Sequence, residues 1–232
     1  MDDPSLPPEE HRRALRGLTR LNHISGVAKA MYRHLYQYAL QNCHRTLKIL
    51  DVASGAGDVP IYWAKCAKRD AVALDITALD ISPTAIEDQQ RRAKIADVQL
   101  ESIQCDCLNV DLPTGYDVVT SSLFMHHLDD GQVVHVLKSM QKATNDKLLI
   151  CDLERSLFNL ALVTIGSHLV TRSKIVHNDG PQSVRAAYTT SEFTALTERA
   201  LGKKMTLETA FPCRFIAMSA KNPTDQSHDN KK

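Results

Sequence analysis

Short apolar runs alternate with amphipathic stretches along most of this chain, and the alternation predicts a parallel β-sheet. The run Leu47–Val52 is almost entirely apolar and leads into a glycine-containing turn, which is typical of a buried parallel strand. Four more runs have the length and composition of strands, and they span Ile76–Asp80, Val98–Cys105, Tyr116–Thr120 and Lys147–Asp152. Parallel neighbours need crossover connections, which are usually helices.

The stretches between these runs carry apolar residues at helical spacing. Helices are predicted over 59–68, 83–95 and 132–144. Ser82 followed by Pro83 has the features of a helix start, because serine caps the first turn and proline suits its first position. Thr189 and Glu192 have the spacing of a capping box, which predicts another helix start.

The two ends of the chain complete the predicted fold. Ala14–Leu40 is predicted to be helical, either as one helix or as two that are divided near Ser25 and Gly26. Met205–Ala210 and Arg214–Ala220 read as two strands with no helix between them, so they should form a hairpin and one of them should run antiparallel. The whole pattern predicts an α/β fold, with a mostly parallel seven-stranded sheet, one antiparallel strand near an edge, and helices on both faces.

The composition narrows the class of protein. A chain of 232 residues with 43% hydrophobic and 24% charged residues is enough for one domain with a proper core. Its net charge of +1 argues against a nucleic-acid partner that would bind through a basic face. The most apolar window, 157–170, is shorter than the roughly 20 residues that span a bilayer, so we expect no membrane span.

The cysteines and the N-terminal residues indicate the cellular compartment of the protein. Six cysteines are scattered along the chain, and Cys105 and Cys107 alone do not make a zinc or disulfide framework. We therefore expect reduced thiols and no metal site. The first residues are acidic and proline-rich, with no apolar signal segment after them, so we expect a cytoplasmic protein.

The turn after the first strand is the strongest candidate for a binding site. Gly55 and Gly57 would let the backbone pass close beneath a ligand, and ligands of open α/β sheets lie outside the carboxyl ends of the strands. A dinucleotide-binding turn needs a third glycine where this chain has Pro60, and no Gly-Lys-Ser/Thr of a phosphate-binding loop follows. Asp51 disfavours a pyrophosphate and favours a ligand with an ammonium or sulfonium group. The alternative is an ordinary strand-to-helix turn.

An acid at the end of the second strand supplies a second anchor. Asp80 can accept hydrogen bonds from both hydroxyls of a ribose. Asp75 is a competitor, but we favour Asp80 because a helix is predicted to begin directly after it.

Four segments, in this order, resemble the motifs of class I S-adenosylmethionine-dependent methyltransferases. They are Leu50-Asp-Val-Ala-Ser-Gly-Ala-Gly57, Leu79-Asp-Ile-Ser-Pro-Thr-Ala-Ile86, Gln104-Cys-Asp-Cys107 and Tyr116-Asp-Val-Val-Thr-Ser-Ser-Leu-Phe-Met-His-His-Leu128. The last segment is similar to that of small-molecule enzymes such as quinone-biosynthesis methyltransferases. The resemblance implies a Rossmann-like fold and S-adenosylmethionine as the cofactor. One departure is Ala53, which stands where the family has its first glycine and which fits if φ is negative there.

The resemblance also implies a role for each motif residue. The turn would support the methionine part of the cofactor, Asp51 would help to hold its amino group, and Asp80 would bind the ribose. Ile81 would pack on the adenine, whose edge would face Asp106. The full set of implied cofactor-binding residues is Asp51, Ala53, Ser54, Gly55, Ala56, Gly57, Asp80, Ile81, Asp106, Cys107, Ser121 and Ser122. A helix around Asn22 and His23 would fold over the cofactor, as in similar enzymes.

His126 and His127 are the candidates for acid–base chemistry. A neutral histidine can take the proton of a phenolic acceptor, whose pKa lies near 10. The alternative is that these histidines cap or pack the helix that follows. Thr120-Ser-Ser-Leu-Phe124 stands where some nucleic-acid methyltransferases have an Asn/Asp-Pro-Pro-aromatic motif, so we expect a small-molecule acceptor.

An insertion after the fifth strand is the candidate for an acceptor-binding segment. The segment of about 157–188 is predicted to form an amphipathic lid over the site, or alternatively a helical dimer face. Arg185, Arg214 and His177 are the candidates for binding the methyl acceptor, although a solvated or structural role is the favoured interpretation for each arginine. Parts of 152–188 and 211–214 more loosely resemble bacterial methyltransferases found beside polyketide synthases, which suggests O-methylation of a phenolic or pyrone product.

These interpretations divide the chain into three parts. Residues 1–46 form a helical cap, 47–220 the methyltransferase domain with its lid, and 221–232 a disordered tail. We expect a monomer or a homodimer. Two other functions stay open at this point, a nucleotide-dependent oxidoreductase and a non-catalytic relative of the methyltransferases.

Overall fold

Seven strands form one sheet in the described residues, 26–170 and 174–220, of this computed structural model; the side chains of 165–179 and 220 lie outside the description. The strands are β1 Leu47–Val52, β2 Leu74–Asp80, β3 Glu101–Gln104, β4 Tyr116–Ser122, β5 Thr144–Leu153, β6 Thr206–Ala210 and β7 Arg214–Ala220. They lie in the order β3-β2-β1-β4-β5-β7-β6.

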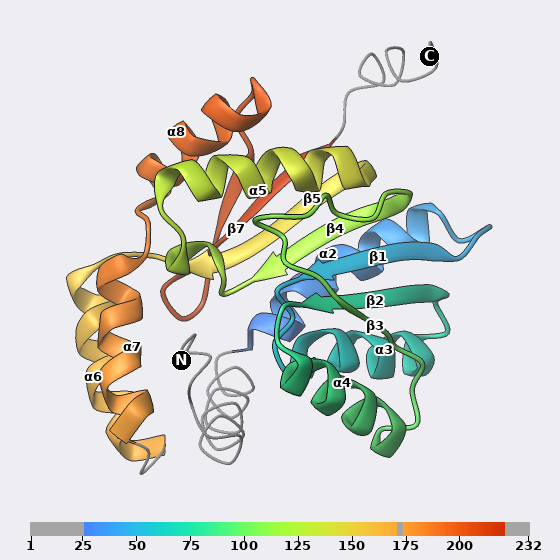
Figure 1. Cartoon of the computed structure of the whole chain (residues 1–232), viewed down its shortest axis with the longest axis horizontal. Helices are drawn as coiled ribbons and strands as arrows, with labels where there is room; N and C mark the ends of the chain where they lie inside the picture. The colour runs from blue at the N-terminus through green and yellow to red at the C-terminus, as the bar shows by residue number, and fades with distance from the viewer. Residues whose placement is uncertain (1–25, 171–173, 221–232) are drawn as a thin grey trace.

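The direction of the strands confirms the predicted sheet. β1 is parallel to β2 and β4, and β3 and β5 continue the parallel part on either side. β7 runs antiparallel to both β5 and β6. Because the five parallel strands share one direction, their carboxyl ends meet at one rim of the sheet (Figure 1).

Helices cover both faces of the sheet, as predicted. They are α2 Val27–Gln41, α3 Asp58–Asp70, α4 Pro83–Ile95, α5 Asp130–Ala143, α6 Leu157–Val170, α7 Lys174–Ala186 and α8 Thr190–Leu201, with a short 3-10 turn η1 at Met125–His127. α2, α3 and α4 lie on one face, and α5 and α8 lie on the other (Figure 1). In the described part of the chain, no helix is long and apolar enough to cross a membrane.

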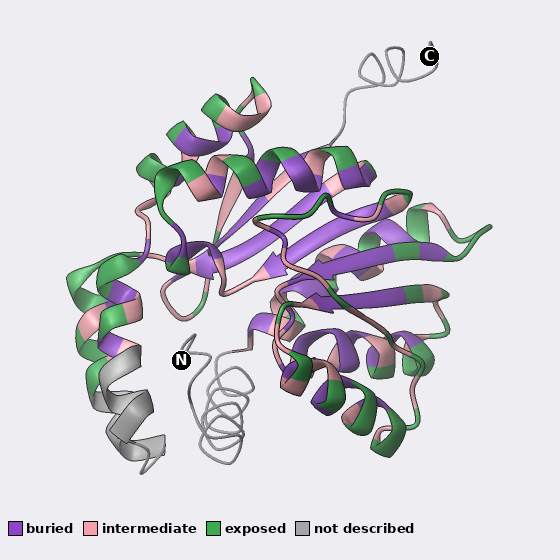
Figure 2. Ribbon diagram, in the orientation of Figure 1, coloured by how far each residue is buried: buried purple, intermediate pink, exposed green. Residues whose placement is uncertain are grey.

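Capping and packing explain where the elements begin and what they bury. Ser82 accepts a hydrogen bond from the Ala85 N–H, and Thr189 forms a capping box with Glu192, which confirms both predicted helix starts. The central strands β1, β2, β4 and β5 are largely buried between the helical layers, whereas β3 and β6 are more exposed (Figure 2). One apolar cluster surrounds Phe193 under α5 and α8, and the other surrounds Trp63 under α2 and α3.

The N-terminal part of the chain is described only from residue 26. Gly26 has a left-handed backbone (φ 68°) directly before α2, at the predicted division of the long helical segment. α2 contributes Met31 and Leu35 to the same cluster as β1. The predicted helix ahead of Ser25, with Asn22 and His23, and the predicted disordered tail at 221–232 lie outside the described residues.

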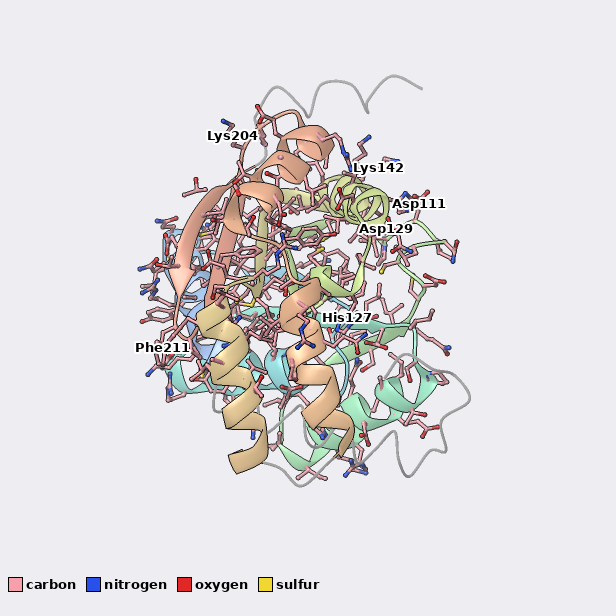
Figure 3. All side chains as sticks on the ribbon, turned by 90° about the vertical axis from the view of Figure 1, so that its left-hand side faces the viewer. Asp111, His127, Asp129, Lys142, Lys204 and Phe211 are labelled. Atoms are coloured by element: carbon pink, nitrogen blue, oxygen red, sulfur yellow. The ribbon has the colours of Figure 1, made fainter. Side chains whose placement is uncertain are left out.

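The segment after β5 forms a helical hairpin at the rim. α6 packs along α7, and α7 also lies against η1. A bridge between Glu154 and Tyr188 joins the two ends of the segment. Figure 3 shows the hairpin in front of the carboxyl ends of the strands, so the insertion predicted at 157–188 stands beside the candidate site.

Candidate functional site

The glycine turn connects β1 to α3 at the rim, and hydrogen bonds fix its backbone. The Ser54 N–H donates to the carbonyl of Leu79 at 2.9 Å, which ties the turn to the end of β2. A Cβ atom added to Gly55 would meet no other atom within 4 Å, so space is open beside this residue. Ala56 is buried beneath the turn. The turn therefore presents bare backbone to an open space, as a ligand-supporting loop does.

Gly57 is required for a different reason. Its φ is 75°, and a Cβ atom there would lie 3.0 Å from Cγ of Gln89. Both the backbone conformation and the close approach of Gln89 therefore disfavour a side chain at this position.

The backbone angle of Ala53 differs from the one that the sequence analysis required. The sequence argument allowed alanine there if φ were negative, but φ is 58°. Alanine therefore occupies the left-handed region, where its Cβ atom crowds the following carbonyl oxygen. The turn keeps the glycine-like shape, with strain at its first residue.

Asp80 faces the glycine turn, as predicted. Its Oδ2 atom accepts a hydrogen bond from the Gly55 N–H at 2.8 Å, and its Oδ1 atom accepts one from the Ser82 N–H at 2.9 Å. The residue is only partly buried, and carboxylate oxygens accept more than one hydrogen bond. Asp75, the competitor, is exposed at the amino end of β2, away from the rim.

Asp51 lies beneath the turn and is fully buried. Its oxygens accept hydrogen bonds from Oγ of Ser54 at 2.7 Å and from Oγ1 of Thr120 at 2.8 Å. Burial raises the pKa of Asp51 to about 7, although the two hydroxyl donors oppose the shift. A cationic group near this carboxylate would favour its ionised form. The two hydroxyl partners were not identified from the sequence.

The other predicted cofactor residues lie along the same rim. Ile81 is 60% exposed at the end of β2, which is unusual for a large apolar side chain and leaves a face for a flat ring. Asp106 follows β3, and its pKa is lowered because Asn109 and the Leu108 N–H donate to it. Cys107 is buried beside it.

Strands β4 and β5 bring a histidine and an aspartate together at the rim. Nδ1 of His126 lies 2.6 Å from Oδ1 of Asp152, and both side chains are buried. Burial raises the pKa of Asp152, but the charge and hydrogen bond of His126 outweigh it, so the pKa falls below its usual range. The sequence placed both residues at strand ends but did not pair them. Ser121 is buried and bonds to the carbonyl of Val52, and Ser122 is partly buried next to it.

The second histidine of the pair differs from the first. His127 is exposed, its ring centroid lies 4.2 Å from that of His126, and it stands beside α7 (Figure 3). The structure thus separates two residues that the sequence left equivalent.

The three residues that are predicted to bind the methyl acceptor have different surroundings. Arg214 is buried at the start of β7, donates to the carbonyl of Pro212 at 3.3 Å, and has a pKa lowered by burial. Arg185 is exposed in the last turn of α7. His177 is within α7, and its side chain lies outside the described residues.

A cavity of about 530 Å³ lies away from this rim. It is open to the surface and is lined by residues of α2, β5, β6 and β7, such as Arg33, Tyr38, Lys147 and Glu208, and none of the predicted site residues lines it. Within the described residues, no group of histidine, cysteine and acidic side chains could hold a metal ion.

Comparisons with known proteins show which proteins this chain is similar to. A family model described as a methyltransferase domain matches residues 49–147, which contain the glycine turn, Asp80 and His126. The mitochondrial ubiquinone biosynthesis O-methyltransferase of Schizosaccharomyces pombe is 29% identical over 135 residues, which cover 56% of this chain and 47% of that protein. The chain thus spans about half the length of this relative.

Solved structures share the fold across most of the chain. The plantazolicin methyltransferase BpumL, solved with a monoazolic desmethylPZN analog and SAH, has a TM-score of 0.66 and 18% identity, and the match covers 90% of each chain. Human N-acetylserotonin methyltransferase, solved with SAM, has a TM-score of 0.65 and 13% identity over 93% of this chain and 57% of that one.

Proposed function

We propose that the chain is a class I, S-adenosylmethionine-dependent methyltransferase that methylates a small molecule; the methyltransferase-domain model that matches residues 49–147 and the fold shared with BpumL support this proposal. The proposed acceptor atom is an oxygen of a phenolic, quinone or polyketide-type compound. Two features carry the proposal: the open glycine turn beside Asp80, which suits the cofactor, and the buried pair of His126 and Asp152, which suits an acidic hydroxyl.

The rim carries the polar and apolar groups that the cofactor needs. Asp80 offers a carboxylate to the ribose hydroxyls, and the exposed Ile81 offers an apolar face to the adenine. Asp51 lies buried beneath the turn, where a positively charged ligand group would favour its ionised form. The space beside Gly55 admits a ligand against the backbone. When bound, S-adenosylmethionine supplies an electrophilic methyl group on a positively charged sulfur.

His126 is the residue that we assign to proton transfer. With its Nδ1 proton directed at Asp152, the ring keeps a lone pair on Nε2, which accepts the hydroxyl proton of the acceptor. Asp152 fixes the orientation of the ring and stabilises the imidazolium that forms. A phenol suits this arrangement because its pKa near 10 makes its proton removable by histidine. The name of the S. pombe relative, an O-methyltransferase, supports oxygen as the acceptor atom.

The test combines a panel of acceptors with substitutions of the histidines. The enzyme is incubated with radiolabelled S-adenosylmethionine and catechol, phenol, hydroquinone or 4-hydroxy-2-pyrone, and the labelled product is extracted. For an acceptor that turns over, His126→Asn should lower kcat by about 100-fold or more, because general-base catalysis is lost, while the Kd for S-adenosylhomocysteine stays unchanged. Asp152→Asn should lower kcat in the same direction. His135→Asn, at an exposed position of α5, is the matched control.

The outcomes separate the alternatives. A larger loss of kcat in His127→Asn than in His126→Asn would contradict the assignment of the base. Binding of NAD in place of S-adenosylmethionine would favour an oxidoreductase. Tight binding of the cofactor with no turnover of any acceptor would favour a non-catalytic relative.

A further inference from the structure

Gln89 is a polar side chain that lies fully buried under the glycine turn. It belongs to the inward-facing side of α4, together with Ala85 and Ala93, and its exposed fraction is 0%. Its stem fills the space beneath Gly57, where a Cβ atom would lie 3.0 Å from the Gln89 Cγ atom. The side chain therefore spans the turn from Gly57 toward Gly55.

The amide of Gln89 holds one side of Gly55, and Asp80 holds the other. Nε2 of Gln89 donates to the carbonyl of Gly55 at 2.8 Å. Oδ2 of Asp80 accepts from the N–H of the same residue at 2.8 Å. Both backbone polar groups of Gly55 are thus fixed by side chains of the following strand and helix, although the residue itself borders open space.

This contact has a cost in stability. Oε1 of Gln89 is buried and has no hydrogen-bond partner among the described residues. Turning the amide over would not help, because Oε1 would then face the carbonyl oxygen of Gly55. A buried acceptor without a partner destabilises a protein, so a residue kept in this state calls for an explanation other than stability.

We propose that Gln89 is a positioning residue for the cofactor, which fixes the backbone of Gly55 at the expense of stability. The proposal rests on the proposed function for the identity of the ligand. The Gly55 peptide is pre-organised between Asp80 and Gln89, so the turn loses little freedom when a ligand packs against it. Without the amide, the turn would have to be ordered on binding.

The test is Gln89→Met. Methionine has a similar length and volume, but it lacks both the Nε2 donor and the unpaired Oε1 acceptor of the glutamine amide. We expect the Kd for S-adenosylhomocysteine, measured by calorimetry, to rise about 3- to 10-fold, which corresponds to one net hydrogen bond. The Tm without ligand should stay unchanged or rise, because removal of the unpaired Oε1 offsets the loss of the hydrogen bond to the carbonyl of the half-buried Gly55. Gln90→Met, at the next and exposed position of α4, should change neither quantity.

Each other outcome has a definite meaning. An unchanged Kd in Gln89→Met would overturn the proposal. A lower Tm, or failure to fold, would also overturn it, because it would show that Gln89 serves stability. Failure of the wild-type protein to bind either S-adenosylmethionine or S-adenosylhomocysteine would instead refute the proposed function.

Discussion

Ala53 stores strain at the first position of the glycine turn. A non-glycine residue in the left-handed region costs about 1–2 kcal/mol, whereas glycine loses about 0.5–1 kcal/mol through its flexibility in the unfolded chain. Ala53→Gly should therefore raise the free energy of unfolding by up to about 1.5 kcal/mol, measured by urea denaturation. Ala56→Gly, at a neighbouring alanine without a positive φ, should lower it. A lower free energy of unfolding in Ala53→Gly would contradict the claim that the backbone of Ala53 is strained.

Asp51 links stability to pH. Its pKa is raised from 3.8 to about 7, so the folded state holds a proton that the unfolded state has lost between these values. The free energy of unfolding therefore declines as pH rises from about 4 to about 7. Above pH 7 the protein bears the full cost of burying the ionised carboxylate. Asp51→Asn removes the penalty, so its stabilising effect should be about 2–3 kcal/mol greater at pH 8 than at pH 5. An effect that is equal at both pH values would show that Asp51 is ionised throughout.

Some site residues were predictable one at a time but not as pairs. Asp51, Asp80 and Asp152 each stand at or near the end of an apolar run, and parallel strands bring such ends to one rim. The hydrogen bond between His126 and Asp152 depends on β4 and β5 being neighbours, which strand order decides. The inward position of Gln89 follows from helical spacing, but its partner does not.

At the scale of elements, α6 and α7 differ from the rest of the molecule. α6 carries no charged residue, yet Leu157 is 87% and Phe158 71% exposed, and its main packing partner is α7. The apolar composition of this segment is equally compatible with a core helix, which is why periodicity alone did not show how it packs. β3 was also predicted too long, because only Glu101–Gln104 pair with β2.

The weak attachment of α6 predicts uneven protection of backbone amides. Opening the N-terminal part of α6 exposes little new apolar surface, whereas opening β4 breaks hydrogen bonds on both sides and a buried core. In hydrogen-exchange mass spectrometry, peptides covering 157–164 should exchange at least about tenfold faster than peptides covering 116–122. Equal protection of the two would mean that α6 is held as firmly as the sheet.

At the scale of the whole molecule, the sequence predicted the overall fold better than it predicted any local detail. Alternation of strands and helices, and a hairpin at the end, determine a sheet with one antiparallel strand, and the structure has that sheet. The packing of the hairpin α6–α7 and the strain at Ala53 depend on tertiary contacts and on backbone angles that no local pattern encodes. The fold was therefore predictable in outline, and the site as a set of strand ends without its internal hydrogen bonds.

In the proposed function, the glycine turn and Asp80 together bind the adenosine part of S-adenosylmethionine. Calorimetric titration of S-adenosylhomocysteine into Asp80→Asn tests it most directly, with Asp75→Asn as the control at an exposed acid of the same strand. Loss of a charge-assisted contact of about 1.5–3 kcal/mol should raise the Kd roughly 10- to 150-fold in Asp80→Asn, and Asp75→Asn should bind like the wild type. An unchanged Kd in a folded Asp80→Asn protein would contradict the claim.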